Sequence, residues 1–192
     1  MALVGFLIFS SASLGLLSGD GANYNRIIRN QSLTLLVGLV ALLVFGRWPY
    51  RHWRKIAFWL FVLSLLGTLL VFVPGLGFSS GGASRWISLG SRTFQPAEFL
   101  KFGFVVYLAA WLAKIRERVT TWKSGFLPFL LFVGLTGMML IAQPDIGTFL
   151  TLFSSAAAMF FVAGAGWRQI GVLILAAIIG FSIVIWFKPY AR

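Results

Sequence analysis

Four charged side chains stand inside or beside long apolar stretches, and these are the residues most suited to chemistry. They are Arg85, Glu98, Lys101 and Asp145. A charge in such a place is costly in hydrocarbon and usually faces a bundle interior or a polar cavity. The guanidinium of Arg85 suits bidentate contacts with phosphate or carboxylate, so we predict an anion-binding role for it. An arginine that extends to lipid headgroups is the alternative, and the residue type fits both.

Glu98 and Lys101 lie three residues apart, a spacing that places them on one face of a helix. They are therefore expected either to neutralise each other structurally or to serve a polar site together. Gln95 and Pro96 predict that this helix begins here. Proline fits the first turn, and a carboxylate close behind it suits the helix dipole.

Asp145 follows Pro144 at the start of another apolar stretch. Its position predicts a helix N-cap whose carboxylate accepts from the amide of Gly147 or Thr148. The alternative is a polar group that lines a cavity. The local sequence favours the cap and leaves the second role open.

The apolar stretches that would position these residues dominate the chain. Of 192 residues, 59% are hydrophobic and 10% are charged, far too few polar residues for a soluble domain of this size. We therefore predict an all-α, polytopic transmembrane helix bundle in one domain. A signal peptide is the alternative for the first stretch. The predicted spans are 1–17, 33–45, 56–73, 97–113, 126–142, 146–163 and 170–187.

The distribution of lysine and arginine predicts the orientation of the spans. Nine of these residues fall in loops 46–55 and 114–125 and in the turn 164–169, whereas six fall on the other side. The basic side is expected to be cytoplasmic. The N-terminus is then inside, and the loop 74–95 and Arg192 are outside.

Composition excludes several classes of function. There is no cysteine, and His52 is the single histidine, so thiolate and multi-histidine metal centres are excluded. The net charge of +12 does not indicate nucleic acid, because the basic residues are scattered among short loops. Control of membrane topology and contact with anionic lipid headgroups explain the basic residues better.

Several motifs together resemble the SEDS family (FtsW/RodA/SpoVE; shape, elongation, division and sporulation proteins). GGASRWISLG at 81–90 and FQPAEFLK at 94–101 are similar to its hallmark, QPDIGT at 143–148 to its QPDLGT, and FSSAS at 9–13 to its first-span YSAS. The order agrees, and the resemblance covers essentially the whole chain. Ala97 replaces the usual serine, and Gly81 stands where division members often have asparagine.

The resemblance implies a peptidoglycan glycosyltransferase of the bacterial inner membrane that polymerises lipid II on the outer side. A class B penicillin-binding protein, a transpeptidase, is the usual partner within the division or elongation complex. A sugar 4-hydroxyl attacks the anomeric carbon and undecaprenyl diphosphate leaves. This chemistry needs a general base for the hydroxyl and cations for the departing diphosphate. A divalent cation can assist there, although no metal motif is present.

The resemblance also implies roles for residues of this sequence. Arg85 and Lys101 would bind substrate, with Glu98 holding Lys101 and Asp145 shaping the polar cavity. The supporting residues it implies are Trp86, Gln95 and Pro96. Family members usually have about ten spans, with the proposed catalytic aspartate in the outside loop after the seventh. We therefore expect the catalytic base to lie beyond Arg192 and this chain to be inactive alone.

Two other functions stay open on the sequence. One is a lipid II flippase or transporter, and the other is a non-catalytic, truncated scaffold of the same machinery. VPGLG at 73–77 and FVAGA at 161–165 favour the division branch, whereas Trp167 and Arg168 also suit the elongation branch. We expect division.

Overall fold

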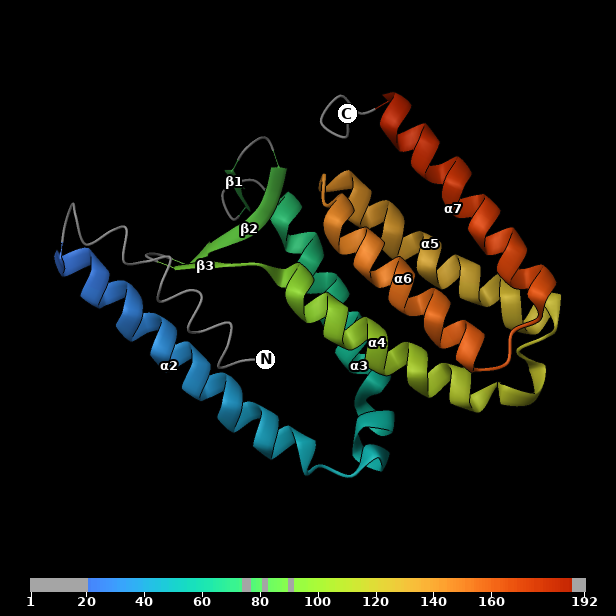
Figure 1. Cartoon of the computed structure of the whole chain (residues 1–192), viewed down its shortest axis with the longest axis horizontal. Helices are drawn as coiled ribbons and strands as arrows, with labels where there is room; N and C mark the ends of the chain where they lie inside the picture. The colour runs from blue at the N-terminus through green and yellow to red at the C-terminus, as the bar shows by residue number, and fades with distance from the viewer. Residues whose placement is uncertain (1–20, 74–76, 81–82, 90–91, 188–192) are drawn as a thin grey trace. The chain divides into compact units, whose positions relative to one another are not determined.

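The chain is an integral membrane protein built of helices. Its computed structural model describes residues 21–73, 77–80, 83–89 and 92–187 (Figure 1). The predicted span 1–17 and the residues 188–192 lie outside this part. The chain divides into two compact units between Tyr50 and Arg51. The first contains helix α2 (Gly21–Gly46), which includes the whole predicted span 33–45.

The described part of the second unit contains five α-helices and carries all the candidate site residues. The helices follow the predicted spans closely, because their apolar residues continue over the length that a bilayer requires. One difference concerns the predicted loop 46–55, since Arg51, Arg54 and Lys55 belong to the first turns of a helix. The helices are α3 (Tyr50–Leu69), α4 (Pro96–Lys114), α5 (Leu127–Ala142), α6 (Ile146–Val162) and α7 (Trp167–Phe187).

Four helical segments in the described part are long and apolar enough to cross a membrane. They are Arg29–Gly46, Tyr50–Phe72, Pro96–Lys114 and Trp122–Ala142. The second includes the 3₁₀ turn Leu70–Phe72 that continues α3, and the last includes the π-helical turn Trp122–Phe126 that precedes α5. Two shorter apolar helical segments, Ile146–Val162 and Trp167–Gly180, follow them.

The predicted outside loop 74–95 contains a small antiparallel sheet. Strands β1 (Gly77–Ser80), β2 (Ala83–Leu89) and β3 (Arg92–Phe94) pair in the order β1-β2-β3. Side chains alternate between the two faces of a strand, so Arg85 and Ile87 share one face and Trp86 takes the other. Ile87 is buried, whereas Trp86 is 36% exposed. Strand β2 packs against the end of α3 and the start of α4.

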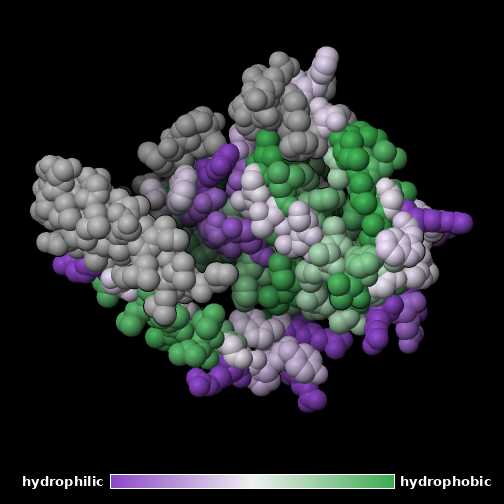
Figure 2. All heavy atoms as spheres, viewed as in Figure 1, coloured by the Kyte–Doolittle hydropathy of each residue, from purple (hydrophilic) through white to green (hydrophobic). Residues whose placement is uncertain are grey.

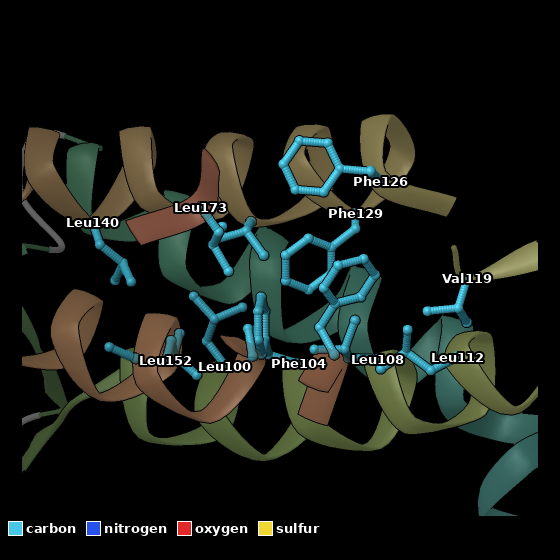
Figure 3. Close-up of a cluster of buried hydrophobic side chains, with 14 residues drawn as sticks. Leu100, Phe104, Leu108, Leu112, Val119, Phe126, Phe129, Leu140, Leu152 and Leu173 are labelled. Atoms are coloured by element: carbon cyan, nitrogen blue, oxygen red, sulfur yellow. The ribbon is translucent and has the colours of Figure 1, made fainter. Parts of the chain in front are cut away.

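The hydrophobic core of the second unit lies between α4, α5 and α6 (Figure 3). Leu100, Phe104 and Leu108 follow one face of α4 at four-residue intervals and are fully buried. Phe129 of α5 stacks on Phe160 of α6, with ring centroids 4.2 Å apart. These contacts fix α4, α5 and α6 against one another.

Helices α3 and α4 approach closely at Gly103. A Cβ atom at this position would lie 2.6 Å from Ser64 Oγ and 3.0 Å from the carbonyl oxygen of Leu60. Contacts this short do not occur between real side chains, so only glycine fits without displacing α3. Small residues at such crossings let helix backbones pack tightly in membranes.

A buried glutamine joins two turns at the end of α5 that is remote from the sheet. Gln169 is 2% exposed. Its Nε2 donates to the carbonyl oxygen of Val119 at 3.2 Å, and its Oε1 accepts from the amide of Gly166 at 2.9 Å. This side chain therefore ties the beginning of α7 to the connection between α4 and α5.

Polar and apolar residues occupy different zones on the surface of this unit. Figure 2 shows hydrophilic residues over the strands and near the connection between α4 and α5, with hydrophobic and intermediate residues over the helices between them. The two polar zones lie at opposite ends of α4, which starts at the strands and ends at that connection. Such a pattern suits a bundle whose middle lies in hydrocarbon.

Candidate functional site

Arg85 projects from β2 onto the turn between α5 and α6. Its Nη2 donates to the carbonyl oxygen of Pro144, and its Nη1 lies 3.7 Å from Asp145 Oδ1. The Arg85 side chain is 36% exposed, whereas that of Asp145 is 4% exposed. Arg85 Nε is buried and has no hydrogen-bond acceptor among the described residues. The guanidinium is therefore held by the turn through Nη1 and Nη2, while part of the side chain remains exposed to solvent.

Asp145 takes the N-cap role that its sequence position predicts and makes further polar contacts. As the N-cap of α6, its Oδ1 accepts from the amide of Thr148 at 3.3 Å. This confirms the predicted cap and selects Thr148 as the donor. Its Oδ2 also accepts from Gln95 Nε2 at 3.4 Å, so the same carboxylate joins the start of α4 to β2 and α6.

Gln143 belongs to this cluster and was not among the predicted site residues. It is 1% exposed, and its Nε2 donates to the carbonyl oxygen of Thr68, near the end of α3, at 2.7 Å. A polar residue at the end of an apolar span, directly before Pro144, was the available signal. Its partner is 75 residues away in the chain, so no local pattern identified the bond.

Glu98 and Lys101 form the predicted pair on the first turns of α4. Lys101 Nζ lies 2.8 Å from Glu98 Oε2, and the glutamate is the more exposed partner, at 56% against 32%. Pro96 occupies the first turn of α4, as predicted, and is buried. Gln95 takes the N-cap position, although its side chain bonds Asp145 and not the helix amides.

The charges of the site balance pair by pair. Arg85 faces Asp145, and Lys101 faces Glu98, so each candidate cation has an acidic neighbour. Among the described residues no three histidine, cysteine, aspartate or glutamate side chains gather around one point. The side chains described here do not form a divalent cation site, and a cation brought by a diphosphate ligand stays a prediction.

These features define a class of protein: a polytopic helical membrane protein with a charge-balanced polar site at one end of its helices. The chain belongs to the FtsW/RodA/SpoVE family of cell cycle proteins, whose family model matches residues 1–192. Three of the four segments that carried the resemblance in the sequence thus meet in space, because Asp145 contacts both Arg85 and Gln95. The fourth, at 9–13, lies outside the described residues.

Individual relatives agree with this assignment. A probable peptidoglycan glycosyltransferase FtsW from Aromatoleum aromaticum is 30% identical over 195 residues, covering 100% of this chain and 48% of the relative. The crystal structure of the rod shape determining protein RodA from Thermus thermophilus superposes with a TM-score of 0.70 at 28% identity. That match covers 93% of this chain and 57% of RodA.

A further solved structure belongs to a peptidoglycan synthase complex that coordinates polymerization and crosslinking. It matches with a TM-score of 0.69 at 27% identity, covering 98% of this chain and 56% of its own chain. This chain spans about half the length of the curated relatives it matches.

Proposed function

We propose that this chain takes part in peptidoglycan polymerisation as a glycosyltransferase of its family, with Arg85 and Lys101 binding the diphosphate of lipid II. The observation that supports the proposal is the convergence of Arg85, Gln95 and the turn 143–145 at one end of the bundle. Relatives that match across these segments carry the name peptidoglycan glycosyltransferase.

The geometry of Arg85 suits a diphosphate ligand. A guanidinium has five N–H donors, and here only Nη1 and Nη2 each face a protein acceptor. The remaining N–H bonds on these two nitrogens can bind phosphate oxygens from the exposed side. In the proposed reaction, a sugar hydroxyl gives its proton to a general base while its oxygen attacks the anomeric carbon. The bond to the diphosphate breaks, and the departing anion stays on Arg85 and Lys101.

Asp145 is not the general base in this proposal. Its two oxygens already meet Arg85, Thr148 and Gln95, and its side chain is 4% exposed. A base must reach the hydroxyl proton within about 3 Å or through one water. We assign Asp145 to the support of Arg85.

Binding of undecaprenyl diphosphate to the purified chain in lipid nanodiscs tests the first step. Arg85→Gln should raise the dissociation constant about tenfold, because it removes a charge-assisted contact. Arg116→Gln, a change at an exposed arginine near the other end of α4, is the matched control and should leave affinity unchanged. Equal effects of the two substitutions would reject the assignment of Arg85.

The whole activity requires its own experiment. The full product of the gene should be produced together with a class B penicillin-binding protein from the same genome and supplied with lipid II. Glycan strands should form, and Arg85→Gln should reduce their amount about tenfold or more. Translocation of lipid II across vesicle membranes without polymer would favour the flippase alternative. A folded complex that shows neither activity would favour the scaffold.

We propose that the protein acts in cell division, and the name FtsW carried by curated relatives supports this branch. Depletion in the native bacterium should then block septation and give filaments. Rounded cells that still divide would place it in elongation.

A further inference from the structure

We infer that Gln143 is a positioning residue for Arg85, and that the turn 143–145 transmits the position of the α3 end to the guanidinium. This inference rests on the proposed function, since it concerns the arginine assigned to the diphosphate. The observation behind it is one turn whose three consecutive residues bond to three different elements.

The first step is the contact between Gln143 and α3. The side chain is 1% exposed, and its Nε2 donates at 2.7 Å to a main-chain carbonyl, that of Thr68. The Thr68 hydroxyl donates to the carbonyl of Ser64, within the same helix, and is itself fully buried. A buried amide that lost its acceptor would be costly, so the bond fixes the turn relative to α3.

The second step leads from the turn to Arg85. The carbonyl oxygen of Pro144 accepts from Nη2, and the carboxylate of Asp145 faces Nη1. Both acceptors lie within two residues of Gln143, so a shift of the turn moves both together. The direction of the guanidinium therefore depends on the position of the turn, and the bond made by Gln143 fixes that position.

The third step concerns what the guanidinium would do without this support. An arginine side chain that loses its fixed partners regains rotamer freedom, and a ligand that binds must remove this freedom again. The position of Arg85 thus affects ligand affinity, although Gln143 does not touch the ligand in this arrangement.

The chain supplies a closely matched control for Gln143 at its other end. Gln169 is also a buried glutamine, and its Nε2 also donates to a main-chain carbonyl, at 3.2 Å from Val119. It lies beside the connection between α4 and α5, at the end of α5 opposite the turn 143–145. Gln143→Leu and Gln169→Leu should both lower the melting temperature, so Gln169→Leu shows what the loss of a buried glutamine does at a site with no contact to Arg85.

The deciding measurement is the modification rate of Arg85 by phenylglyoxal, followed by mass spectrometry on the purified chain in nanodiscs. Gln143→Leu should raise this rate about three- to tenfold, because the guanidinium is no longer held, whereas Gln169→Leu should leave it unchanged. This readout needs no lipid ligand, so it stands even where undecaprenyl diphosphate fails to bind. If the two variants show equal rates at Arg85, the positioning role is wrong.

Ligand affinity gives the second readout. Gln143→Leu should weaken undecaprenyl diphosphate binding about tenfold with the Gln169→Leu variant unchanged. Gln143→Asn is the milder substitution if the leucine variant does not fold, because it keeps the amide and shortens its reach. Retained affinity and an unchanged Arg85 rate in a folded asparagine variant would overturn the inference.

Discussion

The carboxylate of Asp145 combines a structural cap and an ion pair, and the two contributions can be separated by substitution. Asparagine is as good an N-cap as aspartate, so Asp145→Asn keeps the bond from Thr148 through Oδ1. It loses the charge facing Arg85 and puts an NH2 donor where Oδ2 accepts the weak bond from Gln95. We expect it to cost under about 1 kcal/mol of unfolding free energy, because Arg85 is partly exposed.

Asp145→Ala should cost about 2 kcal/mol, since it removes the cap as well. Thermal unfolding followed by circular dichroism in detergent compares the two variants. Equal losses for asparagine and alanine would contradict a major contribution from the cap.

For the pair formed by Glu98 and Lys101, we expect removal of the acidic partner to strengthen ligand binding, whereas Arg85→Gln should weaken it. Glu98 is the more exposed partner, so Glu98→Gln should change the unfolding free energy by less than about 1 kcal/mol. It releases Lys101 from its counter-ion and should tighten undecaprenyl diphosphate binding about two- to fivefold.

The gain from Glu98→Gln should shrink when the salt concentration is raised, because the charges are close to solvent. Titrations at two salt concentrations measure this. Weaker binding by the variant would show that Glu98 holds Lys101 in its binding position, as the family resemblance implied.

Among the side-chain contacts of the site, those between residues close in sequence were predictable, whereas those between distant residues were not. The cap by Asp145 and the pair of Glu98 with Lys101 follow from spacings of three residues. The contact of Arg85 with Pro144 joins residues 59 apart, and that of Gln143 with Thr68 joins residues 75 apart. Periodicity and capping rules describe neighbours along the chain, so they carry no information on such contacts.

The packing of α3 on α4 depends on Gly103, and this gives a prediction at the scale of helices. Gly103→Ala should destabilise the protein by about 1–3 kcal/mol, because the new methyl group would overlap Ser64 Oγ and the Leu60 carbonyl. Gly134→Ala on α5 is the control, since nothing lies within 4 Å of the place that its new methyl group would take.

Helix propensity should make Gly134→Ala neutral or stabilising by up to about 1 kcal/mol. Melting temperatures in detergent check both substitutions. A partial recovery by Ser64→Ala in the Gly103→Ala background would identify the overlapping atom, and equal destabilisation by the two glycine substitutions would rule out the close approach as the cause.

Long apolar stretches in the sequence predict the helices of this protein, but they do not predict its small sheet. Helices α3 to α7 follow from the predicted spans, because burial in hydrocarbon dictates both their length and composition. The sheet of β1, β2 and β3 was expected to be a loop. Its glycine- and serine-rich strands lack a clear apolar alternation, and their pairing depends on contact with α3 and α4.

The absence of cysteine from the whole chain makes its orientation simple to measure. Thr93 on β3 and Thr120 before α5 are exposed and lie at opposite ends of α4. We expect Thr93→Cys to react with a membrane-impermeant maleimide applied outside, and Thr120→Cys to react only after the membrane is opened.

Labelling in spheroplasts, before and after permeabilisation, tests this orientation. The reverse pattern would place the Arg85 cluster on the cytoplasmic side and contradict the proposed polymerisation of lipid II outside. Labelling of both sites from outside would show that the membrane barrier was not intact.

Because Arg85 and Pro144 are far apart in the sequence, the ribosome synthesises them at different times. Arg85 leaves the ribosome 59 residues before the carbonyl of Pro144 that receives its hydrogen bond. At about 5–20 residues per second, this interval is roughly 3–12 s. A guanidinium beside nascent membrane helices must meanwhile remain in water or at the headgroups. The newly made chain therefore passes through a stage in which its helices are inserted while the polar cluster is still open, and insertion factors or proteases would meet the protein in that form.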